Sequence, residues 1–394
     1  MPKVAARARE IGTESAFDVL ARARALEAQG RDVLHLEIGE PDARARPAVL
    51  AAAIQALEQG DAGYVQAAGL PELRRAIAAD VARLRGVPVD PDQVVVTPGG
   101  KPVLFYTVLS VLEPGDEVLV PDPGFPIYTT AVRFAGGVPV ALPLRPEHGS
   151  CLRAADVAER MGPRTRLLIL NSPCNPTGAV TAVGELAAIA QLAQERDLWV
   201  LSDEIYLQLA HGIPGGVAPS FYAQPGAAQR TVLLDGFSKA HAMTGWRLGY
   251  GVFPPALVEP AVRLVVNSVS CTPPFVQRGG LAALSGGQAH VGALRADLAV
   301  RVRRLAAGLD ALPGLACPVP PGAFYAWVDA RGTGISAGEL ADRLLQEAGV
   351  AVLPGTCFGP GGDGYLRLCA GVPARVLDEA VVRIGAFLDG CRSG

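Results

Sequence analysis

Short apolar runs rich in β-branched residues alternate with longer stretches of alanine and leucine through the middle of the chain. Such runs are typical of strands that are buried on both faces of a parallel sheet. The predicted strands are Val94–Thr97, Glu117–Pro121, Val138–Leu142, Arg166–Asn171, Trp199–Asp203, Thr231–Asp235 and Leu248–Phe253. Helical patterns separate several of them, for example at Pro102–Leu112 and Val183–Arg196. This order predicts an α/β fold with a mostly parallel seven-stranded sheet between helices.

The last third of the chain has a different pattern. It predicts a helix at Gly292–Leu312, a strand at Ala323–Val328, a helix at Ala337–Glu347 and a strand at Val350–Val352. These elements favour a smaller α+β domain. We expect the N-terminal helix at Phe17–Gln29 to pack against it.

Chain length also favours two domains. The chain has 394 residues, whereas a single domain usually has roughly 150. We expect a large domain at residues 46–285 and a small domain built from both ends, residues 1–45 and 286–394. A helix predicted at Pro274–Leu284 leads towards their junction.

Composition excludes several classes of protein. Half of the residues are apolar and the formal net charge is -3, which disfavours a disordered chain and a nucleic-acid binder. Apolar runs such as Leu167–Leu170 are too short to cross a bilayer, and residues 1–18 do not resemble a signal peptide. The seven cysteines are scattered without a C-x-x-C pair, so we expect no metal site. We predict a cytoplasmic protein.

Lysine is scarce in this chain. Only Lys3, Lys101 and Lys239 occur, and the other 32 basic residues are arginines. Arginine readily replaces an exposed lysine, because a surface charge contributes little to stability. It cannot replace a lysine that must act as a neutral amine, since guanidinium keeps its proton. Lys101 and Lys239 are therefore candidates for chemistry, although chance also leaves a few lysines.

Polar or glycine-rich segments follow five of the predicted strands. They are Pro98-Gly99-Gly100-Lys101, Asp122-Pro123-Gly124-Phe125-Pro126-Ile127-Tyr128, Asn171-Ser172-Pro173-Cys174-Asn175-Pro176-Thr177-Gly178, Ser202-Asp203-Glu204-Ile205-Tyr206 and Asp235-Gly236-Phe237-Ser238-Lys239. In open α/β sheets, ligands bind outside the carboxyl ends of the strands. We therefore expect one crevice that combines a glycine turn, an aromatic ring, an amide, a carboxylate, a phenol and a lysine.

Part of this set suits the phosphate of a phosphorylated pyridine aldehyde. Gly99 and Gly100 open a helix, whose free backbone N–H groups and positive dipole end attract a phosphate. Ser238 and Arg247 lie on either side of Lys239 and are expected to complete the phosphate site with a hydroxyl and a bidentate guanidinium.

Other residues suit the ring and the aldehyde. Phe125 is predicted to stack on the ring, and Asp203 to keep the ring nitrogen protonated, which makes the ring an electron sink. Tyr206 and Asn175 are expected to hydrogen-bond the ring's 3′-oxygen. Lys239 is expected to hold the aldehyde as a Schiff base and then to carry a proton. Each feature alone also fits a turn, a helix cap or a core residue, so their joint occurrence carries the interpretation.

Three motifs resemble those of the class I/II aminotransferases, which are fold type I enzymes dependent on pyridoxal 5′-phosphate (PLP). The segment Ser238–Tyr250 is similar to the family's lysine signature, with Arg247 eight positions after Lys239. Asn171-x-Pro173-x-Asn175-Pro176-Thr177-Gly178 and Ser202–Tyr206 resemble the two other motifs. The resemblance extends from about Leu34 to Arg367 and points to a subgroup like the bacterial aspartate aminotransferases.

The resemblance implies roles for three further residues. Tyr64 is similar to a tyrosine that reaches the phosphate of the partner subunit. Gly39, in Ile38-Gly39-Glu40-Pro41-Asp42, resembles a glycine that contacts the substrate, and Arg367 matches an arginine that binds the substrate α-carboxylate. The family also implies a homodimer with active sites at the subunit interface.

Three positions depart from the family pattern. His241 stands where Tyr or Phe is common, and Phe125 where aspartate aminotransferases usually have Trp. Gly236 replaces a hydroxyl residue that often helps to bind phosphate. These departures remove no catalytic group, but they leave the substrate open.

The implied reaction moves an amino group between an L-amino acid and a 2-oxo acid, with glutamate/2-oxoglutarate or aspartate/oxaloacetate as one pair. Lys101 resembles a lysine that binds the distal carboxylate of acidic substrates, but a role in supporting the phosphate or capping the helix explains it equally well. The segment Thr13–Phe17 is expected to close over the substrate side chain. Its Glu14 disfavours an acidic substrate and helps to admit a basic or aromatic one.

Two other functions remain open on the sequence. A related fold type I enzyme catalyses β-elimination or another replacement at Cα or Cβ with the same Lys239 and Asp203. A non-catalytic, PLP-sensing regulatory domain is a more distant alternative. Such domains are fused to a basic DNA-binding segment, whereas here only about thirty residues precede the first motif and the charge is balanced.

Overall fold

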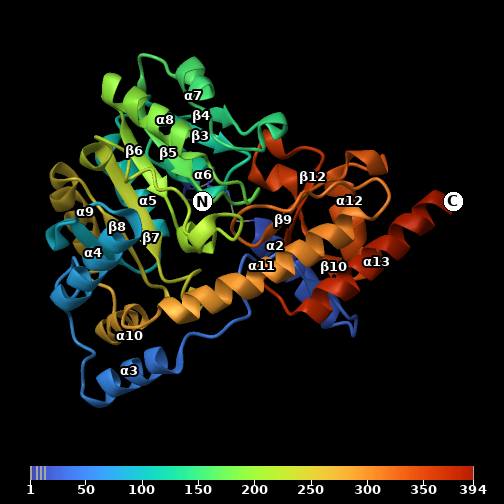
Figure 1. Cartoon of the computed structure of the whole chain (residues 1–394), viewed down its shortest axis with the longest axis horizontal. Helices are drawn as coiled ribbons and strands as arrows, with labels where there is room; N and C mark the ends of the chain where they lie inside the picture. The colour runs from blue at the N-terminus through green and yellow to red at the C-terminus, as the bar shows by residue number, and fades with distance from the viewer. Residues whose placement is uncertain (1, 6–7, 9–10, 13–14, 394) are drawn as a thin grey trace.

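A seven-stranded sheet forms the centre of the computed structural model, which describes residues 2–5, 8, 11–12 and 15–393 (Figure 1). The strands lie in the order β2-β8-β7-β6-β5-β3-β4, and β8 runs antiparallel to both of its neighbours. Their bounds are β2 Val94–Thr97, β3 Glu117–Asp122, β4 Val138–Pro143, β5 Thr165–Asn171, β6 Trp199–Asp203, β7 Thr231–Gly236 and β8 Gly249–Val252. The mostly parallel sheet is confirmed, with each predicted strand end within one residue.

Helices cover both faces of this sheet. They are α4 (Pro71–Arg85), α5 (Lys101–Val111), α6 (Ile127–Phe134), α7 (Ala154–Arg160), α8 (Val183–Glu195), α9 (Pro255–Ser268) and α10 (Pro274–Leu284). Alternate residues of a strand face opposite layers: Leu167 and Ile169 of β5 share a core with α5, α6 and α9. Leu168 and Leu170 share a core with α7 and α8, and α4 and α10 cover that same face at β2 and β8. The continuously apolar strands follow from this double burial.

A second layer is built around a smaller antiparallel sheet in the order β11-β12-β9. Its strands are β9 (Tyr325–Asp329), β11 (Leu353–Pro354) and β12 (Tyr365–Cys369), and a short parallel pair joins β1 (Leu34–His35) to β10 (Val350–Ala351). The helices around it are α2 (Ser15–Glu27), α11 (Gln288–Asp310), α12 (Ala337–Arg343) and α13 (Ala374–Ser393), while α3 (Pro47–Glu58) packs on α10. Figure 1 shows α11 running from α10 at the large domain towards α13, against which it packs.

The N-terminal helix packs where the sequence predicts. Ala23 and Leu26 of α2 share a core with Leu345 and Ala351. The helix predicted at Ala337–Glu347 ends as an α-helix at Arg343 and continues as a π-helical turn over Leu344–Ala348. No helix in the described part of the chain is long and apolar enough to cross a membrane.

Candidate active site

The carboxyl ends of β5, β6 and β7 open into a cavity of about 490 Å³, and β9, β11 and β12 form its opposite wall. Most of the predicted site residues line this cavity. They are Gly39, Gly100, Lys101, Phe125, Asn175, Asp203, Tyr206, Ser238, Lys239, Arg247 and Arg367. The site thus combines residues from both sheets.

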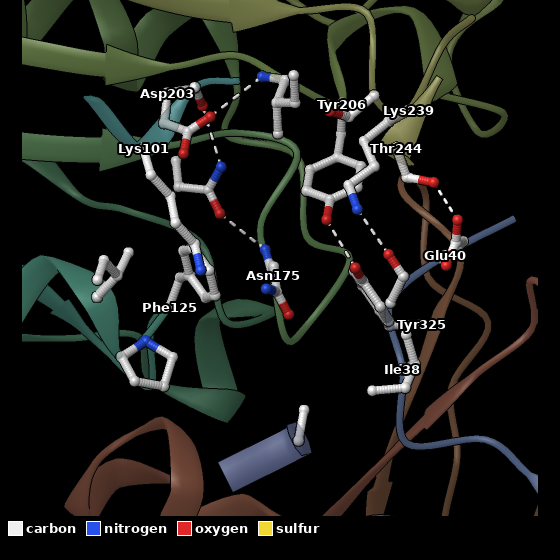
Figure 2. A pocket seen from close by; sticks show the side chains of 18 of the residues that line it. Ile38, Glu40, Lys101, Phe125, Asn175, Asp203, Tyr206, Lys239, Thr244 and Tyr325 are labelled. Carbon is white, nitrogen blue, oxygen red and sulfur yellow. Dashed lines mark hydrogen bonds between the residues drawn. The ribbon is translucent and has the colours of Figure 1, made fainter. Parts of the chain in front are cut away.

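Lys239 follows β7 and extends its side chain towards the segment Ile38–Glu40 (Figure 2). Its Nζ donates a hydrogen bond of 2.6 Å to the carbonyl oxygen of Gly39, and it lies 6.0 Å from the centre of the Tyr206 ring. Burial lowers the pKa of Lys239 to about 8, because the ammonium ion is poorly solvated there. A neutral amine is therefore accessible close to neutral pH, as a nucleophile requires.

Asp203 ends β6 as a buried carboxylate in the cavity wall. The Tyr128 hydroxyl donates to its Oδ2 over 2.7 Å, and the backbone N–H of Ile205 donates to its Oδ1 over 3.2 Å. Burial raises the pKa of Asp203 to about 6 because these neutral donors do not replace the lost hydration. A cation placed against this carboxylate would stabilise its ionised form, so the site suits a protonated pyridine nitrogen.

Asn171 links the ends of two neighbouring strands. Its Nδ2 donates to the carbonyl oxygen of Asp203 over 3.0 Å, and its Oδ1 accepts from the backbone N–H of Asn175 over 2.8 Å. This side chain therefore fixes the loop that carries Asn175 relative to Asp203.

Arg367 stands on β12, facing the large sheet, and is only 4% exposed. Its Nη1 donates to Oδ1 of Asn175 over 3.2 Å, and its Nη2 donates to the carbonyl oxygen of Glu37. The guanidinium lies between the rings of Tyr325 and Phe358, at 4.6 and 4.9 Å from their centres. It is thus held in one plane, which suits recognition of a planar carboxylate.

The N-terminus of α5 and the guanidinium of Arg247 lie close together, and both can bind an anion. Gly99 has a φ of +88°, and a side chain there would overlap the guanidinium of Arg247. Arg247 itself has a φ of +51°, unusual for a residue with a side chain, and its Nη1 donates to the carbonyl oxygen of Thr244 over 2.7 Å. Gly99 is therefore just behind the cavity wall, where its lack of a side chain lets Arg247 approach the helix N-terminus. Ser238 lies in the same cavity wall.

Two tyrosines of the cavity wall are not predicted from the sequence. Tyr128 lies three positions after Phe125, a spacing that places both on one side of a helix start, and their rings meet edge to face at 5.7 Å. Tyr325 comes from the smaller sheet, and its hydroxyl shares a hydrogen bond of 2.6 Å with that of Tyr206. A side chain at Gly39 would overlap the Tyr325 hydroxyl, which explains the glycine.

Lys101 and part of the N-terminal segment contribute to the cavity lining. The Nζ of Lys101 lies 5.8 Å from the centre of the Phe125 ring, and Ser15, Ala16 and Phe17 also line the cavity. These three residues confirm that the N-terminal segment reaches the site. Two residues of that segment, Thr13 and Glu14, lie outside the described part of the chain.

Besides Gly99, three of the singled-out residues do not line the cavity. His241 is buried with its ring 5.4 Å from that of Phe237, and burial lowers its pKa to about 4, so it stays neutral. Gly236 packs closely against Gly249 and the Leu248 carbonyl. Tyr64 is 91% exposed and does not reach the cavity of its own chain.

Comparison with known proteins decides the family. The sequence profile described as "Aminotransferase class I and II" matches residues 31–384. The chain belongs to the class I and II aminotransferases. A probable aspartate/prephenate aminotransferase of Aquifex aeolicus is 36% identical over 391 residues, covering 98% of each chain. The arginine–pyruvate transaminase AruH of Pseudomonas aeruginosa is 38% identical over 370 residues, covering 94% of this chain and 93% of the relative.

The solved structures agree with this assignment. Aspartate aminotransferase from Thermus thermophilus with maleate superposes with a TM-score of 0.93 at 37% identity, over 98% of this chain and 100% of that chain. This aminotransferase therefore has the fold type I architecture, depends on PLP and transfers an amino group between an amino acid and a 2-oxo acid. The prediction of an aminotransferase is confirmed ahead of the elimination enzyme and the regulatory domain.

The chemistry of the cavity fits PLP. It presents an amine of lowered pKa, a buried carboxylate of raised pKa that needs a cation, and a guanidinium beside a helix N-terminus for a phosphate. These are the reactive groups expected for the aldehyde, the ring nitrogen and the phosphate of the cofactor, respectively.

Proposed function

We propose that Lys239 is the amine that bonds the aldehyde carbon of PLP, and that Asp203 pairs with its ring nitrogen. The lowered pKa of Lys239 and the raised pKa of Asp203 support these roles. Gly99, Gly100, Ser238 and Arg247 then bind the phosphate. Phe125 packs against one face of the ring. Asn175 and Tyr206 stand close to its oxygen substituent.

When bound, PLP supplies a carbonyl that exchanges amines and a ring that accepts electrons from the Cα–H bond. The protein supplies the proton transfer and the geometry. With PLP bound, Lys239 would hold the aldehyde carbon, and its Nζ, once freed by a substrate amine, would be the base that moves the proton at Cα. The carbonyl of Gly39, 2.6 Å from Nζ, holds the freed amine close to this position.

Arg367 orients the substrate by its α-carboxylate. The guanidinium is fixed by Asn175, by the Glu37 carbonyl and by two aromatic rings, so it binds without first losing rotational freedom. Gly39 leaves room beside it for the substrate backbone. The carboxylate is thereby anchored on one wall of the cavity while Lys239 acts from the other.

We further propose glutamate/2-oxoglutarate or aspartate/oxaloacetate as one substrate pair. Lys101 offers a cation at the side-chain end of the cavity, and the Thermus thermophilus relative was solved with maleate, a dicarboxylate. Ile38, Phe17 and Phe358 also line the cavity, and this apolar lining favours a larger apolar side chain in the second pair. A screen of amino donors with 2-oxoglutarate, in which loss of the visible absorption of bound PLP is followed in single turnovers, tests both pairs. Release of pyruvate and ammonia from one amino acid without an acceptor would instead indicate elimination.

Lys101→Gln is expected to lower kcat/KM for aspartate and glutamate about 10- to 100-fold and to leave phenylalanine almost unchanged. The reason is that a hydrogen bond to a charged group contributes about 1.5–3 kcal/mol, and only acidic donors form it. The measurement is kcat/KM for the three donors together with the PLP dissociation constant. An equal loss for all donors, with weaker PLP binding, would assign Lys101 to the phosphate.

A homodimer is the assembly that we propose, with Tyr64 reaching the phosphate in the partner subunit. Leu50, Ile54 and Leu57 form an exposed apolar stripe on α3, at the spacing of one helix face. Tyr64 follows this helix closely and is itself exposed. An apolar stripe of this kind favours a protein contact.

Tyr64→Phe is expected to weaken PLP binding about tenfold while leaving the apparent mass of the assembly unchanged. The phenol donates to a charged phosphate, and losing such a hydrogen bond costs about 1.5 kcal/mol or more. Absorbance titration with PLP and analytical ultracentrifugation provide the two measurements. Tyr64 does not reach the cavity of its own chain, so any effect on PLP binding must arise in the cavity of the partner subunit. Unchanged PLP affinity in the dimer would therefore contradict this role.

The domain bounds also remain our proposal. Residues 46–285 contain all seven strands of the large sheet, whereas α2, the smaller sheet and α11 to α13 belong to residues 1–45 and 286–394. This division places the cavity between the two domains, where many ligand sites occur.

A further inference from the structure

Three charged side chains that the reaction does not use form a buried cluster behind the active site. Nε of Arg85 donates to Oε2 of Glu204 over 2.8 Å, and its Nη2 donates to Oδ2 of Asp235 over 2.7 Å. The side chains of Arg85, Glu204 and Asp235 are 0%, 2% and 9% exposed. Ion pairs this deeply buried are costly to desolvate, so their presence calls for a specific role.

The carboxylates of the cluster are extensively hydrogen-bonded. The Ser202 and Ser220 hydroxyls donate to Glu204 over 2.8–2.9 Å, and the backbone N–H of Phe221 donates to it over 3.0 Å. The backbone N–H of Gly236 donates to Oδ1 of Asp235 over 2.7 Å. Burial nevertheless raises the pKa of Asp235 to about 6, since desolvation outweighs the Arg85 guanidinium and the Gly236 donor, so this carboxylate is ionised above about pH 6.

The cluster joins the two strand ends that carry the catalytic groups. Glu204 directly follows Asp203 at the end of β6, and Asp235 lies four positions before Lys239, near the end of β7. Arg85, the last residue of α4, approaches from the sheet face opposite the cavity, where α4 packs. One guanidinium thus ties together the backbones that position the reactive carboxylate and the reactive amine.

The cluster is not electrically balanced. It holds two carboxylates and one guanidinium, and both Glu204 and Asp235 help to raise the pKa of Asp203. The excess negative charge therefore acts on the active site through the sheet, across a region of low dielectric.

We propose that Arg85, Glu204 and Asp235 are positioning residues that set how strongly the cavity favours positive charge on bound PLP, an inference that rests on the proposed roles of Lys239 and Asp203. The two carboxylates favour protonation of the cofactor, and Arg85 limits that effect while holding the strand ends together. None of the three touches the cavity.

Other ionisable groups face these residues. Tyr250 and Tyr222 interact electrostatically with the cluster, and Asp80 interacts with Tyr250. Burial keeps both tyrosines neutral by raising their pKa. Around Lys239, the charged or ionisable neighbours are Glu40, Cys369, Arg367 and Arg247. The Asp235, Glu204 and Arg85 variants below leave all of these groups unchanged. Their effect on the titration midpoint is therefore the same in those variants and in the wild type.

The test is a pH titration of the visible absorption of the holoenzyme, which reports the proton on the nitrogen that joins Lys239 to PLP. Asp235→Asn removes a negative charge, so the midpoint is expected to fall by about half to one pH unit when Asp235 is ionised. Glu204→Gln is expected to act in the same direction. Arg85→Met removes a positive charge and is expected to raise the midpoint, by a smaller amount because the remaining carboxylates then bind protons more readily.

The opposite signs separate this role from a purely structural one. Asp235→Asn and Arg85→Met should both lower the melting temperature, so damage to the fold alone would shift both midpoints in one direction or neither, and that result would overturn the proposal. Arg85→Lys should restore the wild-type midpoint, and Arg83→Met, at an exposed position on the same helix, is the matched control. If Arg85→Met fails to fold, unchanged midpoints in Asp235→Asn and Glu204→Gln overturn the proposal. Failure of the proposed function is distinct, since it would show as visible absorption that survives Lys239→Ala.

Discussion

Lys239→Ala is expected to lower transamination at least about 10⁴-fold and to remove the visible absorption band of bound PLP. The variant loses two functions at once, the amine that bonds the aldehyde and the base that moves the Cα proton, and acid–base catalysis alone contributes about 10²- to 10⁴-fold. The pKa of Lys239, which burial lowers to about 8, supports both proposed roles. Steady-state turnover and an absorption spectrum check the result.

Two other variants control this experiment. Lys3→Ala removes an exposed lysine near the N-terminus and should keep full activity. Lys239→Arg keeps a positive charge but has no neutral amine, so it should be as inactive as Lys239→Ala. Substantial turnover in either Lys239 variant would mean that a different group performs the chemistry.

Asp203→Asn is expected to lower kcat about 10²- to 10⁴-fold and yet to stabilise the PLP-free protein at pH 7.5. The activity falls because the ring nitrogen loses its buried counter-charge, and breaking a buried ion pair costs about 3–5 kcal/mol. The PLP-free protein becomes more stable because the variant no longer buries an ionised carboxylate. Without PLP, the raised pKa of Asp203, about 6, means that folding disfavours the ionised form.

The sign of the pH dependence follows from that shift. Below the unfolded pKa of about 4 the carboxyl is protonated in both states, and the variant should show no charge-related gain. The gain grows as the pH rises through the folded pKa of about 6 and reaches about 2–3 kcal/mol at most. Urea unfolding of the PLP-free proteins at pH 4 and pH 7.5 measures it. A variant that is less stable at pH 7.5 would show that Asp203 is satisfied without the cofactor.

The sequence predicts the large sheet well because its strands are mainly apolar and five of the seven are followed by a polar or glycine-rich segment. The same segments identify Lys239, Asp203 and Asn175, since parallel strands place their carboxyl ends along one edge. The close match between the predicted and observed bounds of β2 to β8 shows how much this local pattern predicts.

The sequence pattern does not predict contacts between residues that are far apart in the chain. Tyr325 reaches Tyr206 from a different sheet, and their positions are 119 residues apart. Arg85 meets Glu204 and Asp235 across 119 and 150 residues, and nothing in the local sequence of α4 marks its last arginine as buried. Such pairs depend on how separately formed layers pack, which a periodic pattern cannot specify.

The division of the site between two sheets has a consequence for how this enzyme diverges. Lys239 and Asp203 belong to the large sheet, while Arg367 and Tyr325 belong to the small one. Repacking of the small core can therefore shift Arg367, the proposed carboxylate anchor, while Lys239 and Asp203 keep their places at the large sheet. Substrate preference and chemical competence are thus able to evolve on separate hydrophobic cores.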